Sequence, residues 1–213
     1  MFFNKLINMN YYDRVIRLGL AIIFFIIAFF WVYGGLEFVF YFLGFLFLIN
    51  SFTGVSELYC IFKLSTCKPK QKYPSGFKRF LIVLILLAIL FLGILLSILL
   101  TNKIFLNDFE KFNSSYKQTL YYLENNDKSK ANDNFAIFKI NFKEFNKKYS
   151  NYKPYIIKSD TEFNRDMEKI NTIIEESDEY FKGTNLTLAH QELIKIDPIL
   201  KDIMSRIGFS EEA

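Results

Sequence analysis

The residues best suited to chemistry in this sequence are two cysteines, Cys60 and Cys67, and one histidine, His190. The cysteines are seven residues apart, so on a helix they would lie two turns apart on the same face. A reduced thiol pair of this kind could take a sulfane sulfur, a metal or an oxidant. Cysteine near a membrane is also often only a small apolar residue, and the spacing matches no CxxC motif. Cys60 and Cys67 are therefore candidate thiols.

His190 lies at the edge of an apolar stripe, where it could point into a cavity opened by a kink at Pro198 and bind haem or a metal. A histidine at a stripe edge is more often a half-buried polar residue. Position 187 is Thr, so the Glu-x-x-His spacing of di-iron bundles is missing. His190 is thus a candidate cofactor-binding residue, while no catalytic residue, no metal site and no particular cofactor is predicted.

The first half of the chain, which contains both cysteines, is strongly apolar. Residues 80–100 form an uncharged run directly after Lys78 and Arg79. At about 1.5 Å of rise per residue this run is ~30 Å long, the thickness of the hydrocarbon core, so it predicts a transmembrane helix. Residues 18–33 and 36–52 predict two more spans, joined by a tight turn at Gly34 and Gly35.

The distribution of positive charge predicts how these spans are oriented. Residues 1–101 carry 9 Lys and Arg against 3 Asp and Glu, and the excess lies before the first span and at residues 53–79. Basic residues in short loops stay on the cytoplasmic side. This pattern predicts a membrane protein with a cytoplasmic amino terminus and an extracytoplasmic part that begins at residue 102.

The second half has a different pattern, with near-balanced charge and apolar residues spaced four and three apart, as on one face of a helix. Four stripes are present, and polar breaks join them, which predicts an up-down four-helix bundle. The stripes are Leu106, Phe109, Phe112, Tyr116, Leu120 and Leu123; Ala131, Phe135, Phe138, Phe142, Phe145 and Tyr149; Phe163, Met167, Ile170, Ile174, Ser177 and Phe181; and Leu186, Ala189, Leu193, Ile196, Leu200, Ile203 and Ile207. Pro198 should kink or split the fourth helix near Asp197.

The predicted fold is all-α, an integral membrane protein with three transmembrane helices followed by a soluble four-helix bundle. Its domains are a two-span hairpin at 1–52, a basic cytoplasmic linker at 53–79, a third transmembrane helix at 80–101 and an extracytoplasmic bundle at 102–213. The expected partners are the lipid bilayer, a second copy of the chain through the transmembrane helices, and an unidentified protein or small molecule at the bundle. The second half contains no run of basic residues interleaved with aromatic ones, so nucleic-acid binding is not predicted.

Short polar motifs flank the first two predicted spans. Asp13-Arg14 and Arg17 enter the first span, Thr53-Gly54 end the second, and Leu58-Tyr59 are followed by Thr66-Cys67. In these motifs residues 8–68 resemble the YgaP-like inner-membrane domain, a small bacterial two-span family often attached to rhodanese-type domains. That family places Cys-Pro directly before the Leu-Tyr pair, where this chain has Ser56 and Glu57.

Together with the resemblance, these observations favour a membrane-anchored binding, sensing or partner-docking module of the bacterial inner membrane. The alternative, suggested by the resemblance to rhodanese-associated membrane domains, is an accessory of sulfur or redox metabolism that uses Cys60 and Cys67 on the cytoplasmic side. A third possibility is a purely structural membrane subunit. The second half has no cysteine, one histidine and no Gly-rich phosphate loop, so its sequence favours binding over catalysis.

Overall fold

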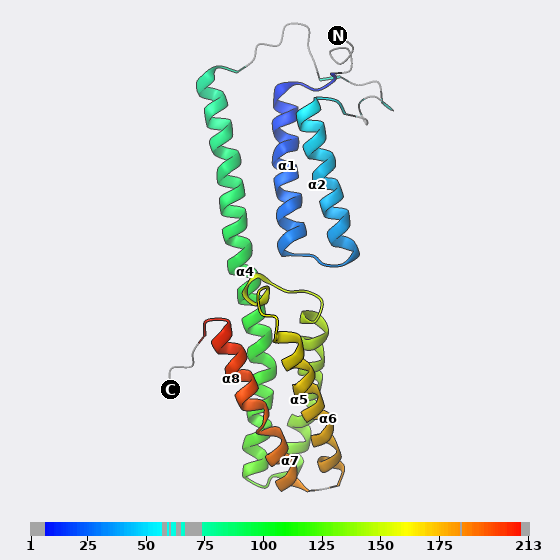
Figure 1. Cartoon of the computed structure of the whole chain (residues 1–213), viewed down its shortest axis with the longest axis vertical. Helices are drawn as coiled ribbons and strands as arrows, with labels where there is room; N and C mark the ends of the chain where they lie inside the picture. Colours follow the sequence, from blue (N-terminus) through cyan, green and yellow to red (C-terminus); the bar gives the residue numbers. More distant parts are fainter. Residues whose placement is uncertain are drawn as a thin grey trace. The chain divides into compact units, whose positions relative to one another are not determined.

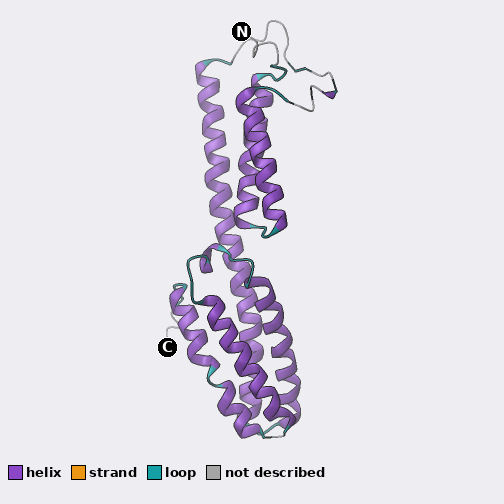
Figure 2. Cartoon of the chain, turned by 45° about the vertical axis from the view of Figure 1, so that its right-hand side comes forward, coloured by secondary structure: helices purple, strands orange, loops and turns teal. Residues whose placement is uncertain are grey.

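The computed structural model describes residues 7–56, 59, 61–62, 65–66, 74–183 and 185–209. Within these residues the secondary structure is helical, and the part of the chain that is described contains no strand (Figure 2). The chain divides into two compact units, Met1–Leu99 and Leu100–Ala213. The all-α prediction is thus confirmed for the described residues.

The first unit holds α1 (Tyr11–Phe30), α2 (Gly35–Thr53) and the beginning of α4 (Gly76–Glu124) (Figure 1). The side chain of Asn10 caps α1 by accepting a hydrogen bond from the Asp13 N–H at 2.8 Å. Gly34, between α1 and α2, and Gly54, after α2, have φ values of 67° and 70°. Glycine adopts this left-handed backbone without steric cost, which explains the turn and the end of α2.

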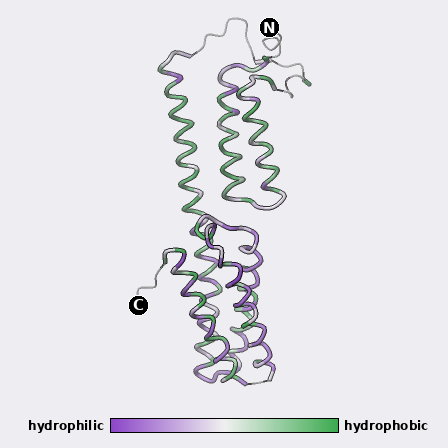
Figure 3. Tube along the Cα trace, in the orientation of Figure 1, coloured by the Kyte–Doolittle hydropathy of each residue, from purple (hydrophilic) through white to green (hydrophobic). Residues whose placement is uncertain are grey.

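The helices of the first unit are apolar along most of their length (Figure 3). Two of them, α2 and α4, are long and apolar enough to cross a membrane. Large apolar side chains point outward from both, such as Phe38 on α2 and Phe91 on α4, which are 77% and 67% exposed. Outward-facing rings of this kind are covered when lipid surrounds a helix. The remaining predicted span, at residues 18–33, corresponds to most of α1. It stays a prediction, since α1 begins with the charged residues Asp13, Arg14 and Arg17.

α4 is one uninterrupted helix from Gly76 to Glu124. The run predicted as a transmembrane helix and the first helix of the predicted bundle are therefore parts of the same helix. No Gly or Pro occurs after Gly93 in α4, and the polar residues at 101–103 have ordinary helix propensity. The apolar run ends at Leu100 without a break in the backbone.

The second unit continues with α5 (Lys128–Tyr149), the 3-10 helix η2 (Tyr155–Ile157), α6 (Phe163–Lys182), α7 (Leu186–Leu193) and α8 (Ile196–Arg206). Its core is rich in aromatic rings. All six predicted positions are buried in both the α5 and the α6 stripe, which confirms those two stripes. Phe105 was not predicted in the core, but it is fully buried one residue before the expected start of the first stripe.

The fourth stripe is divided between α7 and α8, so the predicted effect of Pro198 is confirmed. The break lies at Ile194 and Lys195, a little before the expected position. The Asp197 N–H, which would reach the Leu193 carbonyl in a regular helix, bonds instead to the Ile194 carbonyl at 3.2 Å.

The Leu193 carbonyl left by this break is bound by a side chain of α4. The buried Tyr116 hydroxyl donates to the Leu193 carbonyl at 3.1 Å. Burial and the nearby Asp197 raise the pKa of Tyr116, so this hydroxyl is protonated at neutral pH.

Replacing Tyr116 with Phe is expected to destabilise the second unit by about 1–3 kcal/mol, because the ring is kept while a buried carbonyl loses its donor. Urea denaturation gives the free energy of unfolding. Tyr121→Phe is the matched control on the same helix, since Tyr121 is 60% exposed and its loss should cost less than about 0.5 kcal/mol. Equal effects of the two substitutions would contradict the role of the Tyr116 hydroxyl.

Candidate functional site

Polar side chains close one end of the α1–α2 hairpin and form what we call the polar cap: Asn8, Asp13, Arg17, Ser56 and Thr66. Asn8 binds Ser56 twice, since its Nδ2 donates to the Ser56 carbonyl and its Oδ1 accepts from the Ser56 N–H, each at 2.9 Å. The N–H groups of Asn8 and Met9 both reach the Gly54 carbonyl at 3.2 Å. The segment before α1 is thus fastened to the segment after α2.

Asp13 lies at the centre of the other half of the polar cap. Its Oδ1 accepts from the Arg17 Nε at 3.3 Å, and its Oδ2 accepts from the Thr66 Oγ1 at 3.2 Å. The Arg17 guanidinium lies 5.1 Å from the ring centroid of Tyr59, a cation–π contact. One carboxylate and one guanidinium therefore bind two separate points of the segment that follows α2.

At Gly54 the backbone after α2 is in close contact with a side chain of α1. A side chain at Gly54 would collide with the guanidinium of Arg14, which lies directly against it. Two buried oxygens nearby in sequence, the Asn50 Oδ1 and the Ser56 Oγ, have no hydrogen-bond partner among the described residues. The described groups of the polar cap are suited to holding backbone segments and to recognition, and they do not include an activated nucleophile.

Both candidate thiols, Cys60 and Cys67, lie outside the described residues. The residues that directly precede them, Tyr59 and Thr66, are described, and each contacts a member of the Arg17–Asp13 ion pair. The role predicted for the two thiols stays a prediction.

His190 lies on α7 with its Nε2 3.4 Å from the Glu124 Oε1 on α4, and its side chain is 25% exposed. Its neighbours Ala189 and Leu193 are the residues of α7 that enter the core. Among the described residues, no group of three His, Cys, Asp or Glu side chains could hold a metal ion. A cofactor role for His190 also stays a prediction.

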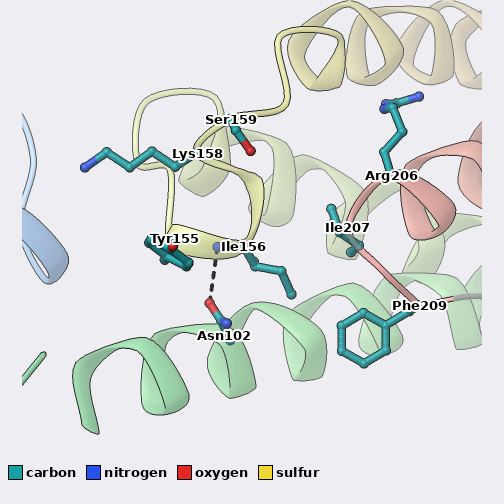
Figure 4. A pocket seen from close by; sticks show the side chains of 8 residues that line it. All are labelled: Asn102, Tyr155, Ile156, Lys158, Ser159, Arg206, Ile207 and Phe209. Carbon is teal, nitrogen blue, oxygen red and sulfur yellow. Dashed lines mark hydrogen bonds between the residues drawn. The ribbon is translucent and has the colours of Figure 1, made fainter. Parts of the chain in front are cut away.

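A cavity of about 530 Å³ opens in the second unit between α4, η2 and the end of α8 (Figure 4). The Asn102 Oδ1 accepts from the Ile156 N–H at 3.2 Å, which fastens η2 to α4. Pro198 and His190 do not line this cavity, in contrast to the cavity expected from the sequence. It is lined by Asn102, Tyr155, Ile156, Lys158, Ser159, Arg206, Ile207 and Phe209.

Arg206 holds a charge cluster beside this cavity. Its Nε lies 3.1 Å from the Asp160 Oδ2, its Nη2 lies 2.6 Å from the Asp166 Oδ2, and it also binds Asp202. Asp166 is only 3% exposed and accepts a second bond from the Lys169 Nζ at 2.9 Å. Burial alone would raise the pKa of Asp166, but the hydrogen bonds from Lys169 and Arg206 outweigh it, so the pKa is lowered.

The sequence analysis missed Asp166, although its position carries a signal. It lies three residues after Phe163 and four before Ile170, both of which face the core. A carboxylate at that spacing is placed on the buried face of the helix and needs a cationic partner.

Comparison with protein-family models matches residues 5–70 to the model described as inner membrane protein YgaP-like, transmembrane domain. This segment is therefore similar to the YgaP-like transmembrane domain. It contains α1, α2 and the polar cap, and the resemblance predicted for residues 8–68 is confirmed. Searches of curated proteins and of solved structures found no match to the chain.

The similarity to the YgaP-like domain and the apolar helices α2 and α4 both indicate a membrane-anchored protein. The motif residues that predicted the family now have a structural role. Asp13 binds both Arg17 and Thr66 in the polar cap, and the side chain of Arg14 lies against Gly54.

Proposed function

We propose that the protein is a docking module that holds a partner protein at the membrane surface. In this proposal α1, α2 and the first part of α4 cross the bilayer, and the second unit is a four-helix bundle in which α7 and α8 form a broken fourth helix. The observation that carries the proposal is the continuity of α4, which supplies both the apolar run and part of the aromatic core. A helix that supplies both segments connects the docking bundle directly to the membrane anchor.

Two contacts support a membrane crossing by α1. Its charged residues lie in the first two turns, where Asp13 and Arg17 pair with each other, and residues 18–30 are uncharged. Near its other end, the Trp31 Nε1 donates to the Ser97 Oγ on α4 at 2.9 Å. A tryptophan that follows an apolar helix is typical of the membrane interface, and this bond joins it to the last turn of the apolar run.

Lys5, Arg14 and Arg17, which precede the uncharged part of α1, and the basic residues at 53–79 support a cytoplasmic amino terminus. With three spans, residues 102–213 would then lie outside. Alkaline phosphatase fused after Ala213 is therefore expected to be active, because this enzyme needs an oxidising compartment. A fluorescent cytoplasmic reporter at the same position should be dark. The reverse result for the two fusions would contradict the orientation.

A pair of isoleucines on α5 is a suitable face for the partner. Ile137 and Ile140 are one turn apart and are 49% and 59% exposed. The stripe that α5 buries is formed by other residues, so these two side chains have no role in the core. Apolar side chains surrounded by polar ones are common at protein interfaces.

Photo-crosslinking in cells tests this function. A crosslinking phenylalanine analogue in place of Ile140 is expected to give a discrete protein adduct, and the same analogue in place of Glu168, exposed on α6, is the control. Ile137→Asp should abolish the adduct, because it places a charge next to the contact. The docking proposal is wrong if both positions give the same products or if Ile137→Asp has no effect.

One observation favours the alternative function in sulfur or redox metabolism. Tyr59 and Thr66, which directly precede Cys60 and Cys67, are both bound to the Arg17–Asp13 pair. In this second proposal the polar cap keeps the segment that carries the thiols against the start of α1, on the cytoplasmic side.

The thiols should then be accessible from one side of the membrane only. In intact cells an impermeant maleimide is expected to leave Cys60 and Cys67 unlabelled, whereas in inverted vesicles at least one should react. Labelling in intact cells would place this segment on the outer side. A Cys60→Ser, Cys67→Ser variant is the control for background labelling.

A further inference from the structure

We propose that η2 and the end of α8 form a surface that rests on the lipid headgroups and binds their phosphates. We call it the headgroup surface and define it by Asn102, Tyr155, Lys158 and Phe209. The inference rests on the proposed crossing of the membrane by the first part of α4.

The position of Asn102 along α4 sets the depth of this surface. Asn102 follows Leu100, the last residue of the apolar run, by two residues in the same helix, which is about 3 Å of rise. The headgroup layer is roughly 5–8 Å thick on each side of the hydrocarbon core. The hydrogen bond from the Ile156 N–H to Asn102 places η2 at this level, so η2 lies within the headgroup layer.

Two exposed aromatic side chains lie at the same level. Tyr155 and Phe209 are 54% and 43% exposed and line the cavity from opposite sides (Figure 4). In water such exposure leaves apolar area uncovered. At a membrane interface these rings sit partly in the apolar layer, and a tyrosine keeps its hydroxyl among the headgroups.

The charge of this end of the second unit complements phosphate. Lys158 and Lys103 are exposed, and Lys153 lies just before η2. The nearest acidic side chain after η2, Asp160, is 6% exposed and bound by Arg206, while Glu162 is bound by Arg165. The exposed lysines beside η2 carry positive charge, which attracts anionic headgroups.

Fluorescence quenching in proteoliposomes tests the depth of the surface with the full chain. Trp31 is the only tryptophan, so a Trp31→Phe background allows single tryptophans to be placed. The test variant is Tyr155→Trp. Its matched control is Tyr121→Trp, because Tyr121 is similarly exposed but lies 19 residues beyond Asn102, about 28 Å along α4. Phe91→Trp, inside the apolar run, reports whether that run is in the bilayer.

Phospholipids brominated near the headgroup end of their acyl chains are expected to quench and blue-shift Tyr155→Trp, and phospholipids brominated near the chain ends are expected to quench Phe91→Trp. Neither should change Tyr121→Trp. If Phe91→Trp is quenched and Tyr155→Trp behaves like Tyr121→Trp, the headgroup surface is wrong and the membrane crossing stands. If Phe91→Trp is not quenched, the membrane crossing fails and this inference fails with it. Equal quenching at 121 and 155 would also overturn the inference.

A charge reversal tests the binding of phosphates. Addition of phosphatidylglycerol to phosphatidylcholine vesicles should increase the quenching of Tyr155→Trp. Lys158→Glu in that variant should remove the increase, whereas Lys128→Glu, at the exposed first residue of α5, should preserve it. Circular dichroism verifies that each variant is folded. If the increase is absent, or survives Lys158→Glu, Lys158 does not bind the headgroups.

Discussion

Replacing Arg206 with Met is expected to destabilise the second unit by about 3–5 kcal/mol. Arg206 binds Asp160 in the segment after η2, Asp166 on α6 and Asp202 on its own helix. Without the guanidinium, the Asp166 carboxylate stays buried with Lys169 as its remaining ionic partner, and that lysine side chain is 50% exposed. The cost arises mainly from this buried, poorly compensated charge.

Urea denaturation of residues 102–213, followed by circular dichroism, measures this effect. The fragment should fold alone because the whole aromatic core lies within residues 105–207. Arg206→Met with Asp166→Leu should recover most of the loss, since replacing both partners removes the buried charge. Arg165→Met is the control, as Arg165 is 61% exposed and should cost less than about 0.5 kcal/mol. A double variant no more stable than Arg206→Met would contradict the explanation.

The same cluster predicts how the second unit responds to acid. The pKa of Asp166 is lower in the folded state than in the unfolded chain. Its contribution to stability is therefore complete above the unfolded pKa of about 3.9 and is lost as the pH falls from there through the folded pKa. The free energy of unfolding should fall less steeply below about pH 4 in Asp166→Asn than in the parent fragment.

Replacing Phe138 with Ala is expected to cost about 3–5 kcal/mol, enough to unfold a marginally stable unit. Phe138 is completely buried and has other rings around it, with centroids 5.5 Å away for Tyr116 and 6.3 Å away for Phe142. These rings belong to α4 and α5 and are themselves enclosed, so they cannot move far enough to fill the space. The cost therefore includes a residual cavity as well as lost burial.

The midpoint of thermal unfolding of residues 102–213 measures this prediction. Ile140→Ala is the matched control on α5, because Ile140 is 59% exposed and its loss should cost less than about 0.5 kcal/mol. A Phe138→Ala fragment that unfolds at the same temperature as the parent would show that this ring is not part of a packed core.

The stripes of the second unit could be predicted because each depends only on spacing within one helix. The four and three spacing of α5 identified every buried residue of that helix. Phe105 and Asp166 were missed for different reasons. Phe105 lies next to the apolar run, where apolar character does not distinguish a core residue from a membrane residue, and Asp166 is buried through partners on other elements.

The polar cap could be predicted only in part. The resemblance to the YgaP-like family identified Asp13, Arg17 and Thr66 as motif residues, but not their contacts. Asn8 and Ser56 are 48 residues apart, and Asp13 and Thr66 are 53 apart. No periodic pattern in the sequence specifies which polar side chains meet over such a separation, because the pairing depends on how the hairpin folds back on itself.

The unbroken α4 also affects how the second unit could be separated from the apolar run by proteolysis. Proteases cleave extended backbone, and a regular helix between residues 76 and 124 offers none. The first turn after α4, at Asn125–Asp127, already lies beyond part of the aromatic core, since Phe112 and Tyr116 are contributed by α4. Cleavage at that turn would leave a core helix attached to the apolar run, so shedding an intact second unit requires that α4 first unwind.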